Sequence, residues 1–304
     1  MLDLHRLRVL FELQRLGTVT AVAEALQYTH SAISQQLAQC ERDVGVKLYE
    51  KVGRRIRLTE QGEILAEYAG RMLALSDEAE SRVLASTSLV RGTIRVTSFQ
   101  TVMSSIIPAA LTVLARTHPD LQVEIKQRDV ETASELLRTR EVDLILGEEY
   151  DADIPATDEY THRELLAEDP LHLITPQEGP WSELTFPELE GVPFAIDPAH
   201  LSMGRFTHQM CLRHGFSPNV VFETPDPFLQ GHLVRTGHAV AIVPRLFLSN
   251  LGNVRVLDLP GNSTRTLYTA VRSGRESHPG LAAFRVALAT ATQHALARAP
   301  EPEV

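Results

Sequence analysis

The sequence predicts an α/β protein in three parts: a small helical module at the N-terminus, a long connecting helix, and a larger module of alternating strands and helices. Apolar residues recur at helical spacing in the first sixty residues, and a heptad-like seam follows them. Strand patterns then alternate with helix patterns over most of the remaining chain. A chain of 304 residues is also longer than one compact core usually fills, so more than one domain is expected.

Three helices are expected in the first forty-five residues. Residues 3–16 form an amphipathic pattern, and further helices are expected over 21–26 and 30–43. Thr29 is the expected N-cap of the third helix, and Gly45 ends it. Two short helices joined by a tight turn are typical of a helix-turn-helix, in which the N-terminal end of the second helix contacts bases in the major groove.

The third helix begins with side chains that can bond to base edges, and a glutamine can do so bidentately to adenine. After it, Val52, Ile56 and Leu58 alternate around Gly53, which predicts a β-hairpin wing whose arginines would reach phosphates or a minor groove. The candidate DNA-contacting residues are therefore Thr29, His30, Ser31, Ser34 and Gln35 in the helix, and Arg54, Arg55 and Arg57 in the wing.

The charge distribution agrees with this hypothesis. The net charge is -10, yet the first sixty residues hold nine basic and seven acidic residues, which leaves 20 basic and 32 acidic residues elsewhere. Five of those nine basic residues lie within 47–57. A local basic patch on an acidic chain suits a nucleic-acid module joined to another domain, although a solvated charged surface would have the same composition.

A connecting helix is expected after Thr59, which can cap it. Its apolar and small residues are spaced by three and four, as in a short heptad seam. Such a seam could pack on its own domain, but a long helix that leads out of a DNA-binding module favours dimerisation. The seam residues are Leu65, Tyr68, Met72, Leu75 and Ala79. The predicted division of the chain is 1–62 for the helix-turn-helix domain, 63–90 for the linker or dimerisation helix, and 91–304 for the α/β domain.

Two α/β halves with parallel sheets are expected in that last domain. We expect lobe I to cover about 91–163 and 268–304, and lobe II, inserted into it, to cover about 164–267. This two-lobed plan resembles that of periplasmic solute-binding proteins. Strands are expected at 93–98, 121–127, 142–146, 171–175, 193–196, 220–222, 239–243 and 265–271, and helices at 104–117, 131–138, 202–214, 228–235 and 279–297.

Open α/β sheets bind small molecules in the crevice at the carboxyl ends of their strands. The segments at these ends hold the candidate effector-binding residues Ser98, Phe99, Gln100, Thr101, Arg128, Gly147, Glu148, Asp197, His200, Thr224 and Asp226. Ordinary turn or capping chemistry is the alternative for each, and for Arg128 and Asp226 the two interpretations are evenly balanced. Hydroxyls and free N–H groups suit a carboxylate, whereas the acids favour an amino acid or amine.

The motifs resemble those of the LysR-type transcriptional regulators. The resemblance runs through Gly17–Leu26, Thr29–Leu37, Glu41, Gly45–Leu48 and Arg57–Gly62, and it covers residues 3–62 continuously. It implies a transcriptional regulator that binds double-stranded operator or promoter DNA, responds to a small-molecule effector in its C-terminal domain and forms a homodimer or homotetramer. RNA polymerase is a further partner that such a regulator could contact.

The segment Thr29–Ser31 departs from the family's usual Ser-Gln-Pro, and Gln35 stands where the family often has arginine. The base preference therefore does not carry over. An architectural DNA binder and a transport-type solute-binding protein are the rival interpretations.

Other classes have little support. Two cysteines imply no disulfide framework, and no apolar stretch reaches the ~18 residues of a membrane helix, so a cytoplasmic protein without membrane contact is expected. The helical spacing of His208, Cys211 and His214 could suit zinc, but packing and surface roles are favoured. No HExxH, P-loop or GxSxG motif occurs. We therefore expect no cofactor, no metal, no catalytic residues and no enzyme activity.

Overall fold

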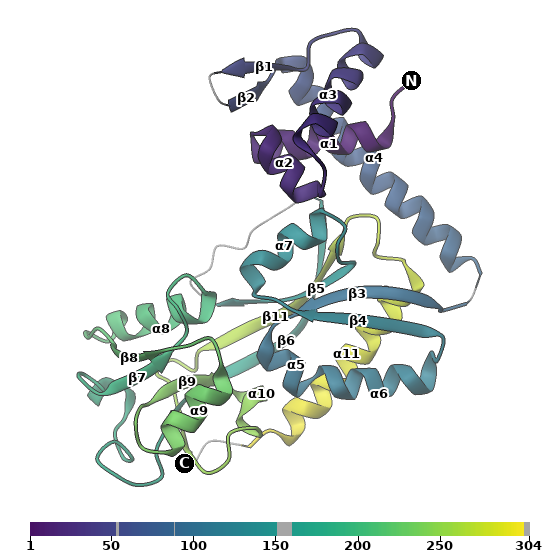
Figure 1. Cartoon of the computed structure of the whole chain (residues 1–304). Coiled ribbons are helices and arrows are strands. Elements are labelled where there is room, and N and C mark those ends of the chain that lie inside the picture. Colours follow the sequence, from purple (N-terminus) through teal and green to yellow (C-terminus); the bar gives the residue numbers. More distant parts are fainter. Residues whose placement is uncertain (53–54, 88, 151–159, 301–304) are drawn as a thin grey trace.

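The computed structural model describes residues 1–52, 55–87, 89–150 and 160–300. Figure 1 shows a small helical module at one end, a long helix that descends from it, and an α/β module that contains the rest of the chain. This arrangement confirms the predicted fold class. Within the described residues, no helix is both long and apolar enough to cross a membrane.

The N-terminal module contains three helices and a hairpin. Thr18 and Thr29 cap the second and third helices, and their hydroxyls accept hydrogen bonds from Ala21 N at 3.1 Å and Ala32 N at 3.2 Å. Gly45 ends the third helix with φ 76°, a conformation that glycine adopts without steric strain. The elements are α1 (Leu4–Leu16), α2 (Val19–Leu26), α3 (His30–Val44), β1 (Tyr49–Val52) and β2 (Arg55–Leu58). The turn predicted at Gly53 lies outside the described residues.

Helix α4 (Glu60–Ala85) links the two modules and has two contrasting faces. Ala66 and Ala69 are fully buried, and α4 packs closely against α1. On the other face, the seam residues Tyr68 and Leu75 are 48% and 65% exposed. The helix therefore packs on its own chain through its small residues and leaves larger apolar side chains uncovered.

The main sheet has seven strands in the order β10-β6-β11-β5-β3-β4, with β9 also paired to β6. The expected parallel pairing holds for β3 with β4 and β5, but β11 is antiparallel to both β5 and β6. Strand patterning reports which face is buried and not the direction of a neighbour, so the sequence did not reveal this reversal. The strands are β3 (Gly92–Ser98), β4 (Leu121–Gln127), β5 (Leu144–Tyr150), β6 (Thr161–Thr175), β9 (Ala241–Pro244), β10 (Arg255–Asp258) and β11 (Thr264–Arg272).

The helix expected over 104–117 is two helices. Pro108 lacks a backbone N–H, so it cannot continue an earlier helix but fits in the first turn of a new one. The chain therefore breaks at Ile106, between α5 (Gln100–Ser105) and α6 (Ile107–Thr117). Helix α11 (Pro279–Arg298) packs beside α6, and α7 (Val130–Arg138) contacts β5.

The second part of the α/β module is arranged around β6, which was expected to start at Leu171 but begins ten residues earlier. The polar residues before Leu171 concealed the strand. β10 and a short helix, α10, were not predicted. The remaining elements are η1 (Phe186–Glu188), β7 (Pro193–Ile196), α8 (Ser202–Arg213), β8 (Asn219–Glu223), α9 (Pro227–Arg235) and α10 (Arg245–Leu248). β7 and β8 form a separate parallel pair.

Separate apolar cores support the N-terminal module and the two parts of the α/β module. Leu10 and Ile33 belong to the first, Val96 and Phe284 to the second, and Phe194 to a third. Strands β6 and β11 run between the last two.

Candidate functional site

The N-terminal turn of α3 presents polar side chains to solvent. Thr29, His30, Ser31 and Gln35 are exposed, and Ser34 is half-buried. The opposite face of α3 is anchored in the core by the fully buried residues Ile33, Leu37 and Cys40. This spacing of three and four directs the candidate base-reading residues outward from a rigid support.

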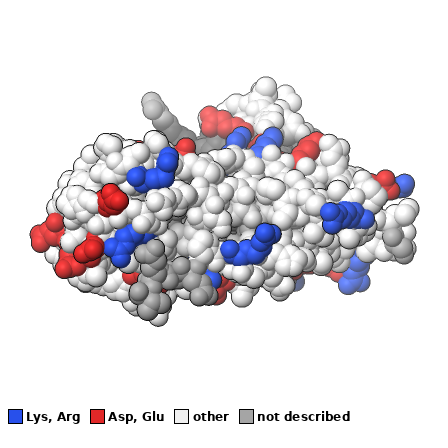
Figure 2. All heavy atoms as spheres, turned by 90° about the horizontal axis from the view of Figure 1, so that it is seen from below, with Lys and Arg blue, Asp and Glu red and all other residues white. Residues whose placement is uncertain are grey.

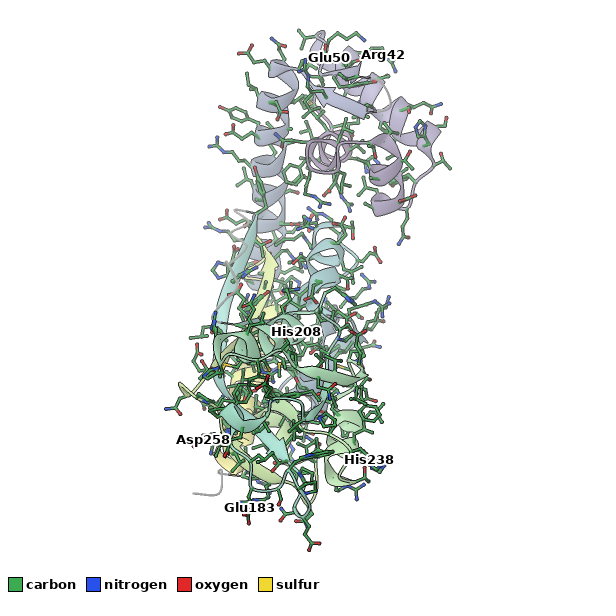
Figure 3. The ribbon with its side chains drawn as sticks, turned by 90° about the vertical axis from the view of Figure 1, so that its left-hand side faces the viewer. Arg42, Glu50, Glu183, His208, His238 and Asp258 are labelled. Atoms are coloured by element: carbon green, nitrogen blue, oxygen red, sulfur yellow. The ribbon has the colours of Figure 1, made fainter. Side chains whose placement is uncertain are left out.

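The hairpin lies beyond α3, at the end of the molecule farthest from the α/β module, where Figure 3 labels Arg42 and Glu50. Glu50 is directly opposite Arg57 in the β1–β2 register, and Arg57 Nε donates to Glu50 Oε1 at 3.1 Å. Arg57 is nevertheless exposed. Arg54 lies outside the described residues. Arg55 belongs to β2, but its side chain is also outside what the structure describes.

The face of the α/β module opposite to the N-terminal module carries charges of both signs. Figure 2 views the α/β module from below, opposite to the N-terminal module, and there the described basic and acidic side chains are scattered among uncharged ones. Such a mixed surface lacks the single sign that attracts a phosphate backbone. The exposed polar end of α3 is therefore the better candidate interface for nucleic acid.

A cavity of about 110 Å³ lies between the two parts of the α/β module. One part contributes residues from the start of α5, the end of β4, β5, the start of α7 and β11. The other contributes residues that follow β7, the starts of α8 and α9, and β9. Five of the candidate effector-binding residues line it, namely Phe99, Gln100, Thr101, Glu148 and Asp197. They are brought together from sequence positions almost a hundred residues apart.

Three other candidates lie close to this cavity without lining it. Ser98 is buried at the end of β3, and Asp226 caps α9 while it accepts a hydrogen bond from Gln100 Nε2 at 3.0 Å. The carbonyl of Thr224 accepts from Gln230 Nε2 at 2.7 Å. Asp226 and Thr224 thus hold the side chains of Gln100 and Gln230, which line the cavity.

The last three candidates are outside the lining. Arg128 is exposed and its guanidinium donates to the carbonyl of Gln127 at 2.7 Å. His200 is exposed, and its carbonyl accepts from Arg205 at 2.6 Å. A side chain at Gly147 would meet the ring of Tyr268 at 2.2 Å, so glycine is required there for packing.

Arg265, which the sequence reasoning did not identify, is the cationic side chain among the described lining residues and is only 2% exposed. Its Nη2 donates to Asp169 at 2.7 Å, and its Nη1 donates to Glu148 at 2.6 Å and to the hydroxyl of Thr101 at 3.0 Å. Burial alone would lower the pKa of Arg265, but Asp169 and Glu148 raise it above its ordinary value. No local feature of strand β11, which also contains three threonines and Arg272, distinguishes Arg265 in the sequence.

The carboxylates of the cavity have perturbed pKa values. Burial raises the pKa of Asp197 to about 7; a hydrogen bond from Gln230 opposes that shift, and the nearby negative charge of Glu148, Asp129 and Glu131 adds to it. Burial also raises the pKa of Glu148, against the effect of Arg265. Both shifts indicate acidic groups crowded into a poorly hydrated space, which is typical of binding sites.

The zinc alternative finds no support: among the described residues, no three histidine, cysteine or acidic side chains are placed so that they could hold a metal ion together. The ring Nδ1 of His208 lies 2.9 Å from the carbonyl of Gly204, and that of His214 lies 2.9 Å from the carbonyl of Met210. Burial raises the pKa of the Cys211 thiol to about 12, which disfavours the thiolate that a metal needs. These side chains have packing partners along α8.

A second set of polar contacts joins the α/β module to the N-terminal module and α4. Asp77 of α4, 2% exposed, accepts from Arg140 at 2.8 Å and from Arg272 at 3.2 Å. The guanidinium of Arg8 donates to the carbonyl of Thr139 at 2.5 Å. Helix α7 therefore has its N-terminal end at the cavity, and the residues that follow its C-terminal end contact the N-terminal module and α4.

Family models match both modules. One described as a LysR substrate binding domain matches residues 87–293, and another described as a bacterial regulatory helix-turn-helix protein of the lysR family matches residues 4–63. The chain belongs to the LysR family. The predicted resemblance is thereby confirmed, and it extends over both modules. The model that matches residues 4–63 describes a regulatory protein and not an enzyme.

Relatives of this LysR-family chain include a probable RuBisCO transcriptional regulator of Porphyra purpurea, 30% identical over 182 residues, which are 60% of this chain and 56% of the relative. The matches to this regulator and to that of Emiliania huxleyi thus span just over half of those relatives' length. The regulator BenM of Acinetobacter baylyi is 23% identical over 287 residues, which cover 91% of this chain and 92% of BenM.

Solved structures of full-length regulators share the fold. A full-length OxyR variant from Pseudomonas aeruginosa has a TM-score of 0.66 at 17% identity, with 100% of this chain and 99% of OxyR covered. CbnR in complex with its target DNA has a TM-score of 0.53 at 20% identity, with 97% of this chain and 100% of CbnR covered. At such low sequence identity, these likenesses establish only the architecture of this LysR-family chain.

Proposed function

We propose that the protein is a sequence-specific transcriptional regulator that reads operator or promoter DNA in the cytoplasm and is controlled by a small molecule bound in the cavity. The observation that carries this proposal is the exposed polar turn at the start of α3, held on a buried apolar face at the free end of the molecule. A helix presented in this way fits the major groove of B-form DNA.

The DNA-contacting residues divide into two groups. His30, Ser31, Ser34 and Gln35 contact base edges, with Thr29 as the cap that fixes the start of the helix. Arg54, Arg55 and Arg57 of the hairpin contact phosphates or a minor groove and hold the helix in place. Glu50 already bonds to Arg57 and would have to release it to DNA.

The assembly that binds DNA is a homodimer or a homotetramer formed through α4. Tyr68 and Leu75 are exposed on the face of α4 that turns away from its own domains, and Ile64 is 53% exposed beside them. Uncovered apolar side chains at heptad-like spacing favour a second helix as their partner. A dimer of dimers on DNA would also offer a surface to RNA polymerase.

The effector domain divides as the sequence suggests, into lobe I over about 91–163 and 268–304 and lobe II over about 164–267, with 1–62 and 63–90 as the preceding parts. An effector bound between the lobes contacts Glu131 at the start of α7, and the residues after α7 contact Arg8 and Asp77. A ligand that favours one arrangement of the lobes would shift α7 and change the spacing of the DNA-reading helices. The effector class expected from the sequence is a small carboxylate or amino acid, and the charges of the cavity narrow this class.

Selection from a random-sequence duplex library with the full-length protein tests the DNA-reading role. We expect the selected duplexes to bind at least a hundredfold more tightly than random DNA at physiological salt, as specific regulators do. Equal affinity for both would instead indicate an architectural DNA binder. Footprinting on the selected duplex, with and without effector, then tests whether the protected length changes.

Two classes of variant test the division of roles. His30→Ala and Gln35→Ala should relax sequence specificity, each with a loss of about 1–3 kcal/mol on the selected duplex. Arg54→Ala and Arg55→Ala should weaken binding to all duplexes alike and reduce its salt dependence. If the two classes behave in the same way, the division into base-reading helix and backbone-holding wing is wrong.

A further inference from the structure

The charge balance of the cavity is unusual for a site that binds a carboxylate. Four acidic residues line it, Asp129, Glu131, Glu148 and Asp197, whereas Arg265 is the one cationic residue among the described lining residues. Its guanidinium is already bonded to Asp169, Glu148 and Thr101. A carboxylate ligand would have to compete with two buried carboxylates of the protein for these donors.

Other groups that commonly bind anions are also occupied. At the start of α8, Glu131 accepts hydrogen bonds from Ser202 N at 2.8 Å and Ser202 Oγ at 2.9 Å. At the start of α9, Asp226 accepts from Phe228 N at 3.0 Å. The protein's own carboxylates therefore stand where an anionic ligand would bind at these helix N-termini.

Asp197 is arranged as a hydrogen-bond acceptor at the cavity wall. One of its oxygens accepts from Gln230 Nε2 at 2.6 Å, and the same Nε2 donates to the carbonyl of Thr224 at 2.7 Å. Gln230 is only 3% exposed, and its amide nitrogen donates to two acceptors. The amide is therefore fixed, and it holds Asp197 in place. Glu148, Asp129 and Glu131 are negative neighbours of Asp197, and its one side-chain hydrogen bond within the described part of the chain comes from a neutral amide.

We propose that the effector is a small organic monocation, an alkylammonium or a guanidinium compound, whose charged end donates hydrogen bonds to Asp197 on the side of the cavity that Glu148 also lines. The proposal rests on the effector-binding function proposed above and narrows its ligand class. An ammonium neutralises part of the negative charge of the crowded carboxylates. It has only hydrogen-bond donors, which suit carboxylate acceptors.

The rest of the cavity suits the uncharged part of such a compound. Phe99, Leu201 and Ile242 line it with apolar surface. A volume of about 110 Å³ corresponds to roughly four water molecules. This space accommodates a short alkyl chain with one charged group.

Calorimetric titration of the full-length protein with butylammonium, butyrate and 4-aminobutyrate tests the class, because the three probes differ in charge and little in size. We expect butylammonium to bind at least tenfold more tightly than either of the others at pH 8. Since Asp197 has a pKa of about 7, protonation should weaken butylammonium binding by up to about tenfold for each pH unit below 7. A carboxylate that bonded to protonated Asp197 would show the opposite dependence.

Asp197→Asn provides the residue-level test, with Asp258→Asn as its matched control. Asp258 has an exposed carboxylate on β10, outside the cavity, so its variant removes the same charge from the same domain. We expect Asp197→Asn to lose about tenfold or more in butylammonium affinity and to lose the pH dependence. The control should keep both.

The proposal is overturned if butyrate or 4-aminobutyrate binds as tightly as butylammonium, if butylammonium fails to bind at millimolar concentration, or if both variants behave alike. DNA selection without any ligand is measured in parallel. Retained selection together with failed butylammonium binding rejects the ligand class alone, whereas failed selection rejects the regulator function itself. Thermal unfolding of each variant shows whether its fold is intact.

Discussion

Two buried clusters of arginine and carboxylate have opposite composition. In the cavity cluster, one arginine, Arg265, lies between the carboxylates of Asp169 and Glu148. In the interface cluster, Asp77 lies between Arg140 and Arg272, and Asp143 pairs with Arg272 and Arg275. The first therefore has an excess of negative charge and the second an excess of positive charge.

The difference follows from what each cluster borders. The cavity cluster joins β5, β6 and β11 inside one module and faces an open space, so its surplus charge is available to a ligand. The interface cluster joins α4 to the α/β module, and its charges are directed at one another across that junction. Strand β11 carries Arg265 near its first residue and Arg272 at its last, so one rigid strand connects the two clusters.

Removal of the central arginine of the cavity cluster should have the largest effect on stability. Arg265→Ala leaves the carboxylate of Asp169, which is fully buried, without its ionic partner, and we expect a loss of about 3–5 kcal/mol in the free energy of unfolding. Urea denaturation measures it. Arg213→Ala, on the exposed side of α8, is the control and should change little. A loss below about 1 kcal/mol would mean that the cluster is structurally dispensable.

Loss of the interface carboxylate should have a smaller effect, since Arg140 keeps about 30% exposure and can be hydrated in its absence. For Asp77→Ala we expect a loss of about 1–3 kcal/mol in the free energy of unfolding and faster hydrogen exchange in α1 and α7. Glu78→Ala, one residue along the same helix and more exposed, is the control. Unchanged exchange in α1 would show that the interface cluster does not hold the N-terminal module.

Asp197 should lower the stability of the ligand-free protein. Its pKa in the folded chain is about 7, above its ordinary value of 3.8, so the folded state binds more protons than the unfolded state and stability falls as the pH rises from about 4 to 7. Asp197→Asn should therefore be more stable than the parent at pH 8, by roughly 1–2 kcal/mol after allowance for cavity water. The gain should vanish near pH 4. A gain that is independent of pH would contradict this origin.

The contrast between the clusters also shows what the sequence could reveal. Caps, glycine stops and apolar spacing are local, and they predicted α1 to α3 and the long helix at Thr59 closely. Ends of predicted strands then pointed to Phe99, Thr101, Glu148 and Asp197. Arg265 was missed because its partners lie 96 and 117 residues earlier in the chain. The hydrophobic periodicity of a strand does not show which distant strand it pairs with.

The interface cluster could not be predicted from the sequence either, because its members are also distant along the chain. Asp77 sits in a helix whose predicted seam is on another face, and nothing local marks its burial among arginines from two distant segments. The antiparallel direction of β11, which brings Arg272 to α4, was also predicted wrongly. Charged residues in such places look like ordinary surface residues until the fold has brought their partners together.

The smallest effect is expected at the rim of the interface, where Arg15 bonds to Glu135 of α7 at 2.8 Å. Glu135 is 37% exposed and Arg15 also bonds to Glu12, so Glu135→Gln should cost about 0.2–1 kcal/mol, and less at high salt. Thermal unfolding at two salt concentrations measures this cost, with Glu183→Gln, at the far end of the molecule in Figure 3, as the control. A salt-independent loss as large as that of Asp77→Ala would mean that α7 is held to α1 mainly at its rim, and the central role of the interface cluster would then have to be abandoned.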